Sequence, residues 1–297
     1  VLGSVGQGLC AAIIAAAAVL VEGPLLGLIV CLALAALAVL RALCSLTGKD
    51  VQGRTISKGH RGVVTGRATQ LGGAVTLITG VILAVLGELP RWGLAALLAI
   101  GAATWLLAAA VFRGIEEPVP ENSGREGMNR SWWKDTWQLY TQDARFRSFV
   151  NVRALLLVSA LSTSFIVVLS QSIGSQALSG LGGFVLASGL ASLVGGRVSG
   201  VLSDKSSRLV MSWAAGFAAV ILLGIVACAT WAPAAVSMWA LPLGFFLVNL
   251  AHAAIRVARK TYVVYMAGED KRTRYVGAAN TMMGVILLVI GGISAVI

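Results

Sequence analysis

Long apolar runs dominate this chain, and short polar stretches separate them. A helix needs about 20 apolar residues to cross the ~30 Å hydrocarbon core of a bilayer. Nine runs are long enough, and each predicts a membrane-spanning helix because a helix satisfies its backbone hydrogen bonds internally. The predicted spans cover about 3–20, 25–44, 69–87, 93–113, 149–171, 178–198, 209–230, 236–256 and 275–297.

The gaps between the predicted spans alternate between two kinds. One set is short and nearly uncharged, and the other is longer and basic. Of the 23 Lys and Arg residues, Arg91 alone lies in the short set, and the other 22 lie on the opposite side of the membrane or at its rim. Because basic loops stay in the cytoplasm, we predict a multi-pass protein of the plasma (inner) membrane with its basic loops cytoplasmic.

Composition agrees with this assignment and narrows the partners. The chain has 297 residues, of which 58% are hydrophobic and 12% charged, whereas soluble domains carry roughly 25% charged residues. The net charge of +11 falls between apolar runs, so we expect the lipid bilayer as partner and no nucleic acid. The four cysteines form no CxxC pair, and we expect no metal and no cofactor.

The longest gap divides the chain into three predicted parts. Residues 1–113 form a partial N-terminal bundle of four spans, 114–148 a cytoplasmic linker, and 149–297 a C-terminal bundle of five spans. Within the linker, Trp133, Trp137 and Tyr140 recur at helical spacing among charges. This pattern predicts an amphipathic helix, which either lies at the lipid–water interface or packs on the cytoplasmic ends of the spans.

One gap carries a recognisable motif. Between the sixth and seventh predicted spans the chain reads Gly-Val-Leu-Ser-Asp-Lys-Ser-Ser-Arg from position 200 to 208. This stretch resembles the cytoplasmic loop signature of the major facilitator superfamily, Gly-x-x-x-Asp-(Arg/Lys)-x-Gly-(Arg/Lys)-(Arg/Lys). Ser207 and Leu209 depart from the signature. The matching residues are Gly200, Asp204, Lys205 and Arg208.

The resemblance implies an all-α fold of two helical bundles and a function. In that superfamily, twelve spans form two halves, and this chain resembles spans three to eleven, so we expect it to be truncated at both ends. The resemblance further implies a secondary transporter, not an enzyme, that moves a small solute by alternating access. Proton coupling is one option within that reading, and we expect a monomer.

The motif suggests a conformational switch. A carboxylate can bind the N-terminus of a neighbouring helix or pair with an arginine. In the superfamily such contacts hold one access state, and the pseudo-symmetry of the halves predicts that Asp204 faces the start of the third span. Its candidate partners there are Arg61, Arg67 and Thr69. The alternative is a plain turn, with Gly200 allowing close helix approach and the charges giving solubility.

Polar side chains within the spans are candidates for a solute or proton pathway, since they are costly in lipid. Asn249, His252 and Arg256 are spaced three and four apart, which places them on one helical stripe. His252 titrates near neutral pH and is a candidate proton carrier. Snorkelling of the arginine and helix-to-helix hydrogen bonds are the alternatives. Further candidates are Gln70, Asn151, Ser162, Thr163 and Asn280, and the fifth span also carries Arg153, Ser159 and Ser164.

The sequence is also compatible with two other classes of membrane protein. A receptor or scaffold on the same fold would look alike in sequence. An integral-membrane enzyme would need paired carboxylates, a metal cluster or an activated nucleophile. The chain has two histidines, His60 and His252, and its acids are scattered, so no such group assembles in the sequence.

Overall fold

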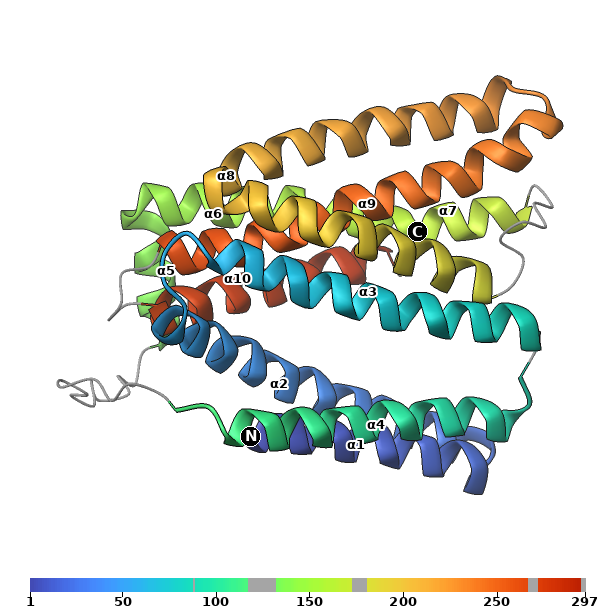
Figure 1. Ribbon diagram of the computed structural model, residues 1–297, viewed down its shortest axis with the longest axis horizontal. Coiled ribbons are helices and arrows are strands. Elements are labelled where there is room, and N and C mark those ends of the chain that lie inside the picture. Colours follow the sequence, from blue (N-terminus) through green and yellow to red (C-terminus); the bar gives the residue numbers. More distant parts are fainter. Residues whose placement is uncertain (88, 117–131, 173–180, 267–271, 295–297) are drawn as a thin grey trace. The chain divides into compact units, whose positions relative to one another are not determined.

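Helices joined by short turns make up the part of the chain that the computed structural model describes, which is residues 1–87, 89–116, 132–172, 181–266 and 272–294. Within these ranges there is no strand. The helices are α1 (Leu2–Leu20), α2 (Gly23–Thr55), α3 (Arg61–Leu86), α4 (Arg91–Arg113), α5 (Trp132–Gln142), α6 (Ala144–Leu155), α7 (Leu157–Ser172), α8 (Leu181–Trp231), α9 (Ala234–Met266) and α10 (Arg272–Ser294) (Figure 1).

Each predicted span overlaps a helix, but the spans and the helices do not correspond one to one. Six described helices, α1, α2, α3, α4, α8 and α9, are long and apolar enough to cross a membrane. Two predicted spans are joined in α8, whose Ser206 has non-helical backbone angles, and the span predicted over 149–171 is divided between α6 and α7. The all-helical membrane fold is therefore confirmed, and the count of nine spans is not.

Several helices continue beyond the apolar runs into the basic gaps. The run that ends near residue 44 belongs to a helix that reaches Thr55, and the run that ends near residue 256 belongs to one that reaches Met266. Polar residues such as Lys, Arg and Gln are good helix formers, so a helix can leave the bilayer without ending. Asp50 and Arg54 form an ion pair at 2.8 Å along the extension of α2.

The chain divides into two compact units. The first comprises Val1–Thr55 and Glu88–Ser123, and the second comprises Ile56–Gly87 and Gly124–Ile297. The helix α3 thus packs with helices that follow the linker, across the boundary predicted from the sequence. The division into two related bundles stays a prediction.

In the first unit, α1 packs against both α2 and α4. The buried side chain of Gln7 donates hydrogen bonds to the Cys44 sulfur and to the Gly3 carbonyl, both at 3.2 Å. At the opposite end, Glu22 and Arg91 form an exposed ion pair between two of the short gaps. The first contact therefore joins α1 to α2, and the ion pair joins the turn between α1 and α2 to the start of α4.

The second unit has an apolar core between α7, α8 and α9. Ile225 and Leu241 lie at its centre, and the rings of Phe184 and Phe245 meet edge to face at 5.1 Å. Aromatic pairs also hold α6 in place. Phe149 lies 5.4 Å from the ring of Tyr262 on α9, and Phe146 lies 5.5 Å from that of Tyr275 on α10.

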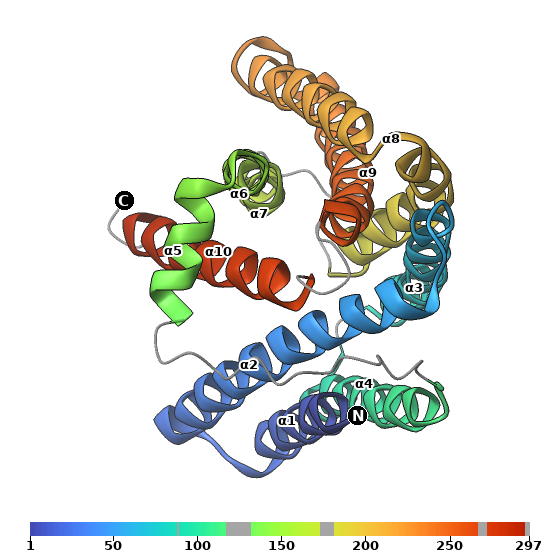
Figure 2. The same ribbon diagram turned by 90° about the vertical axis from the view of Figure 1, so that its left-hand side faces the viewer.

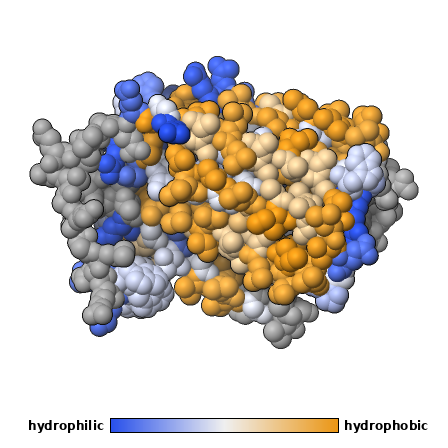
Figure 3. All heavy atoms as spheres, turned by 90° about the horizontal axis from the view of Figure 1, so that it is seen from below, coloured by the Kyte–Doolittle hydropathy of each residue, from blue (hydrophilic) through white to orange (hydrophobic). Residues whose placement is uncertain are grey.

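Large apolar side chains cover much of the molecular surface. On the face shown in Figure 3, hydrophobic residues form a continuous area between hydrophilic groups at its two ends. Leu32 and Val39 are both 63% exposed, and Leu107 is 66% exposed. Soluble proteins do not expose apolar areas of this kind without a partner, so this surface fits contact with lipid.

Candidate functional site

The contact between α3 and α8 is the most extensive helix pairing in the described chain, and Figures 1 and 2 show the two helices side by side. A Cβ on Gly66 would lie 2.4 Å from the Gly196 carbonyl oxygen and 2.7 Å from the Gly200 Cα. Gly73 and Gly80 are equally close to the backbone of α8. Glycine is therefore required at this interface, because any side chain would push the two backbones apart.

Asp204 lies where this interface reaches the first turn of α3. The Gly62 N–H donates to Asp204 Oδ1 at 2.6 Å, and the Val63 N–H donates to Asp204 Oδ2 at 2.7 Å. Residues 62 and 63 open the helix, so their N–H groups have no carbonyl partner within it. The carboxylate satisfies both groups and complements the positive end of the helix dipole.

Tyr265 near the end of α9 completes the contact. Its hydroxyl donates to Asp204 Oδ1 at 3.1 Å and accepts from the Gly59 N–H at 2.7 Å. The guanidinium carbon of Arg61 lies 5.4 Å from the centre of the Tyr265 ring, within cation–π range. We call Asp204, Tyr265, Gly59 and the first turn of α3 the aspartate node; it joins α3, α8 and α9.

The predicted partners take different positions around the aspartate node. Arg61 is buried and donates from Nε to the Ile56 carbonyl oxygen at 3.0 Å. Arg67 is exposed, and Thr69 donates to the Thr65 carbonyl oxygen in its own helix. The start of α3 thus meets Asp204 through backbone N–H groups. Tyr265 and Gly59 are not among the partners predicted from the sequence. The position of Tyr265 in a basic gap is the one sequence feature that could have pointed to it.

The rest of the motif forms a corner within α8. Ser206 has φ −158° and ψ 94°, and its hydroxyl accepts a hydrogen bond from the Leu209 N–H at 3.3 Å. That geometry is an N-cap, so the second half of α8 begins at Ser206. Lys205 and Arg208 are exposed at the corner, and Gly200 lies against the Gly62 carbonyl oxygen.

A second charged group lies between α6, α9 and α10. Both terminal nitrogens of Arg153 donate to Asn280 Oδ1 at 3.2 Å. On α9, the stripe of His252 and Arg256 continues at Arg259, one further turn along the helix. Arg256 donates to the Ser192 hydroxyl on α8 at 3.3 Å. We call Arg153, His252, Arg256, Arg259 and Asn280 the arginine cluster.

Like charges are neighbours in the arginine cluster. The charges of Arg153 and Arg259 act on each other, and those of Arg256 and Arg259 act on His252. In the described ranges, neither Arg153 nor Arg259 forms an ion pair. Buried Arg153 Nε and His252 Nδ1 have no hydrogen-bond partner there. The cluster therefore keeps unused capacity to bind an anion.

Two other pathway candidates form hydrogen bonds with residues outside this cluster. Asn249 donates to the Phe245 carbonyl oxygen in its own helix at 2.9 Å. Asn151 is exposed and accepts a hydrogen bond from the Tyr140 hydroxyl at 2.8 Å, which ties α6 to α5. Three further candidates are partly exposed: Gln70 on α3, and Ser162 and Thr163 on α7.

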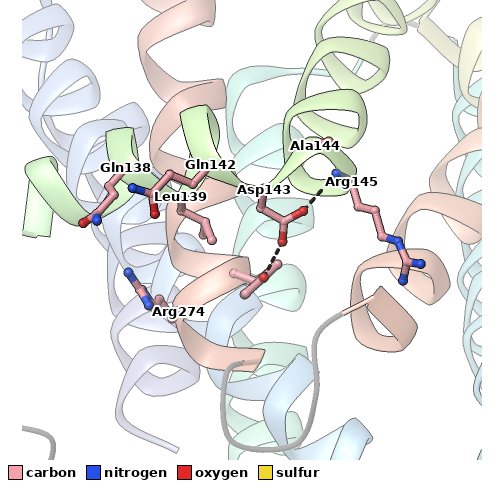
Figure 4. Close-up of a pocket in the computed structure, with 8 residues that line it drawn as sticks. Gln138, Leu139, Gln142, Asp143, Ala144, Arg145 and Arg274 are labelled. Atoms are coloured by element: carbon pink, nitrogen blue, oxygen red, sulfur yellow. Dashed lines mark hydrogen bonds between the residues drawn. The ribbon is translucent and has the colours of Figure 1, made fainter.

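The junction of α5 and α6 forms an open pocket of about 550 Å³, shown in Figure 4. Asp143 caps α6 by accepting from the Arg145 and Phe146 N–H groups at 2.9 and 3.0 Å. The Tyr275 hydroxyl also donates to this carboxylate, and that bond is the main reason why the pKa of Asp143 lies below its usual value. The backbone hydrogen bonds and the charge of Arg145 act in the same direction, against desolvation.

The helix α5 forms where the linker helix is predicted, and part of it is packed. Thr136 and Leu139 are buried on one side, where they pack within the second unit. Trp132, Trp133 and Trp137 are between 44% and 60% exposed. Aromatic rings are favoured at the lipid–water interface, so the exposed tryptophan rings can contact either water or lipid headgroups.

An all-helical fold with lipid-facing surfaces defines a multi-pass membrane protein. The family model of the Major Facilitator Superfamily matches residues 1–292, and this chain belongs to that superfamily of membrane transporters. No curated protein and no solved structure matches the chain. Family members are typically transporters and not enzymes, and among the described residues no group of His, Cys, Asp and Glu could hold a metal ion.

Proposed function

We propose that this protein is a secondary active transporter that moves a small solute by alternating access, and that the aspartate node stabilises one access state. The observation that carries the proposal is the pair of hydrogen bonds from the first turn of α3 to Asp204. The helix α3 precedes the central linker and α8 follows it. A single carboxylate therefore ties together segments from the two sides of the linker.

The energy of this contact suits a switch. A hydrogen bond to a charged group contributes about 1.5–3 kcal/mol net of the bonds that water would otherwise make. A contact made in one access state but not in the other needs to differ by about 1–3 kcal/mol to shift the ratio of the two states 5- to 150-fold. A single net hydrogen bond to the Asp204 carboxylate already falls within that range.

The side of the membrane on which the aspartate node lies decides which access state it favours. The excess of Lys and Arg in alternate gaps supports a cytoplasmic position for the node, in the plasma membrane. A contact that holds α3 against α8 at that end closes the cytoplasmic side, so we propose that it favours the outward-open state. Coupling to protons through His252 and a monomeric state stay predictions from the sequence.

Transport by membrane vesicles loaded with a defined mixture of small solutes tests this function. Vesicles with the native protein should gain or lose at least one solute when a proton or sodium gradient is imposed, as measured by mass spectrometry. The Asp204→Asn variant should change that rate about tenfold, since a shift of roughly 1.4 kcal/mol corresponds to a factor of ten. The matched control is Glu116→Gln, which removes an exposed carboxylate outside the node.

Two outcomes would contradict the proposal. A native protein that changes the content of no solute under either gradient would favour a receptor or scaffold on the same fold. If the Asp204→Asn variant transports at the native rate, the protein is still a transporter, but the aspartate node has no role in its mechanism.

A further inference from the structure

The arginine cluster gathers positively charged side chains from helices that are far apart in the sequence. Arg153 comes from α6, Asn280 from α10, and three residues from successive turns of α9. Asn280 accepts both hydrogen bonds from Arg153 through one oxygen, which orients the guanidinium group without neutralising it. An amide that orients a cation is a typical feature of a binding site, because the charge remains available to a ligand.

Such a concentration of charge is costly unless something compensates it. Charged groups within membrane helices are rare, and they usually face a cavity and pair with one another or with a ligand. Here the neighbouring charges are alike: Arg259 acts on Arg153, and Arg256 acts on Arg259. Two buried nitrogens, Arg153 Nε and His252 Nδ1, also lack a hydrogen-bond partner in the described part of the chain. Each of these features disfavours an empty site and favours an anion in it.

We propose that the arginine cluster binds the carboxylate or phosphate group of a small organic anion, and that this anion is the transported solute. The guanidinium group presents its donors in a planar fork that matches the two oxygens of a carboxylate or phosphate. Arg153 and Arg259 supply the charge, and His252 supplies a further polar atom. The assignment of this anion as the cargo rests on the proposed transport function, whereas binding itself does not.

An acidic lipid headgroup carries the same chemistry as a free anion, so the test must separate the two sources. The protein is reconstituted in nanodiscs of phosphatidylcholine alone, or of phosphatidylcholine with phosphatidylglycerol. Its unfolding temperature is then measured with increasing benzoate, succinate or inorganic phosphate. Benzamide and succinamide are the neutral controls of matching shape, and tetraethylammonium is the cationic control. A ligand that binds the native state raises the unfolding temperature, and the stabilisation grows with the logarithm of its concentration relative to its dissociation constant.

We expect at least one of the three anions to stabilise the native protein in phosphatidylcholine nanodiscs, and none of the neutral or cationic probes to do so. Arg259→Gln and Arg153→Gln should weaken the apparent affinity for that anion at least tenfold. Arg259→Lys should recover part of it because it restores the charge without the planar fork. Arg113→Gln removes an exposed arginine of the first unit and should bind like the native protein.

The site proposal is overturned if no anion stabilises the protein, if the neutral probes do so equally, or if phosphatidylglycerol is the sole anion that does. It is also overturned if Arg113→Gln weakens binding as much as Arg259→Gln. The Asp204→Asn variant keeps the two proposals apart, since it should bind the anion while its transport rate changes. If the native protein binds the anion but transports no solute, the proposed transport function is contradicted and the proposed anion site is not.

Discussion

The aspartate node and the arginine cluster both place charge between helices of the second unit, but they differ in how that charge is satisfied. Both oxygens of Asp204 accept hydrogen bonds, from two helix-opening N–H groups and from the Tyr265 hydroxyl. The arginine cluster has like charges as neighbours and buried nitrogens without partners in the described residues. A charged group whose hydrogen bonds are all made to the protein holds helices together. A charged group with unused hydrogen-bond donors can still bind a ligand.

This difference has an energetic basis. A buried hydrogen bond contributes modestly when it is made, but leaving a buried polar group without a partner costs about 1–3 kcal/mol, and more for a charged group. The node therefore stabilises the state in which it forms. The arginine cluster raises the free energy of the empty site, so a ligand that satisfies it gains the difference on binding.

The largest effect should come from the glycine contact that supports the aspartate node. We expect Gly66→Ala to lower the free energy of unfolding by roughly 1–3 kcal/mol, the usual cost of overpacking, because its Cβ would meet the backbone of α8. The matched control is Gly72→Ala on the same helix, where a Cβ meets nothing within 4 Å. Thermal unfolding of both variants in nanodiscs measures the difference, and equal unfolding temperatures would show that α3 and α8 do not pack this closely.

A smaller effect should follow from removing one donor from the node. Tyr265→Phe deletes the hydrogen bonds with Asp204 and Gly59 but keeps the ring beneath Arg61. Water can replace the tyrosine at the exposed Gly59, so the net loss is close to one hydrogen bond, about 0.5–1.5 kcal/mol. The access equilibrium should therefore shift less than in Asp204→Asn. Tyr262→Phe serves as the control, since the ring of Tyr262 contacts Phe149. A transport rate altered equally by both variants would argue against a specific role for Tyr265.

The smallest effect concerns pH at the junction of α5 and α6. The pKa of Asp143 is lowered in the folded protein from 3.8, mainly by the Tyr275 hydroxyl, so the carboxylate stabilises the fold above that value. This contribution should be complete at neutral pH and disappear as pH falls from about 3.8 through the lowered pKa. Hydrogen exchange at the Arg145 and Phe146 amides should therefore accelerate at acidic pH, beyond the intrinsic change. In Asp143→Asn the same amides should show no such step, and a step that persists there would assign it to another group.

Sequence alone located the broad features of both sites for identifiable reasons. Hydrophobic length located the helices, and the motif at Asp204 together with pseudo-symmetry pointed to the start of α3, which the structure brings against Asp204. Helical periodicity grouped His252 with Arg256. These are local or family patterns, and they can be read from one sequence.

The remaining features depend on how distant segments pack, which no local pattern specifies. Backbone N–H groups of Gly62 and Val63 bind Asp204, where side chains of Arg67 and Thr69 were expected. Arg153 and Asn280 are 127 positions apart, so their hydrogen bonds could not be anticipated from spacing. Hydropathy also missed the extensions of α2 and α9, because it detects the thickness of the bilayer and not the end of a helix.

The most direct test of the central claim is the distance between the start of α3 and the corner of α8. Spin labels at the exposed positions Lys58 and Leu209, in a background with the four native cysteines replaced, report that distance by double electron–electron resonance. The native protein should show a dominant short-distance population, and Asp204→Asn should shift its ratio to a longer-distance population by roughly tenfold, as expected for a bias of about 1.4 kcal/mol. Identical distance distributions in the two proteins would contradict the account.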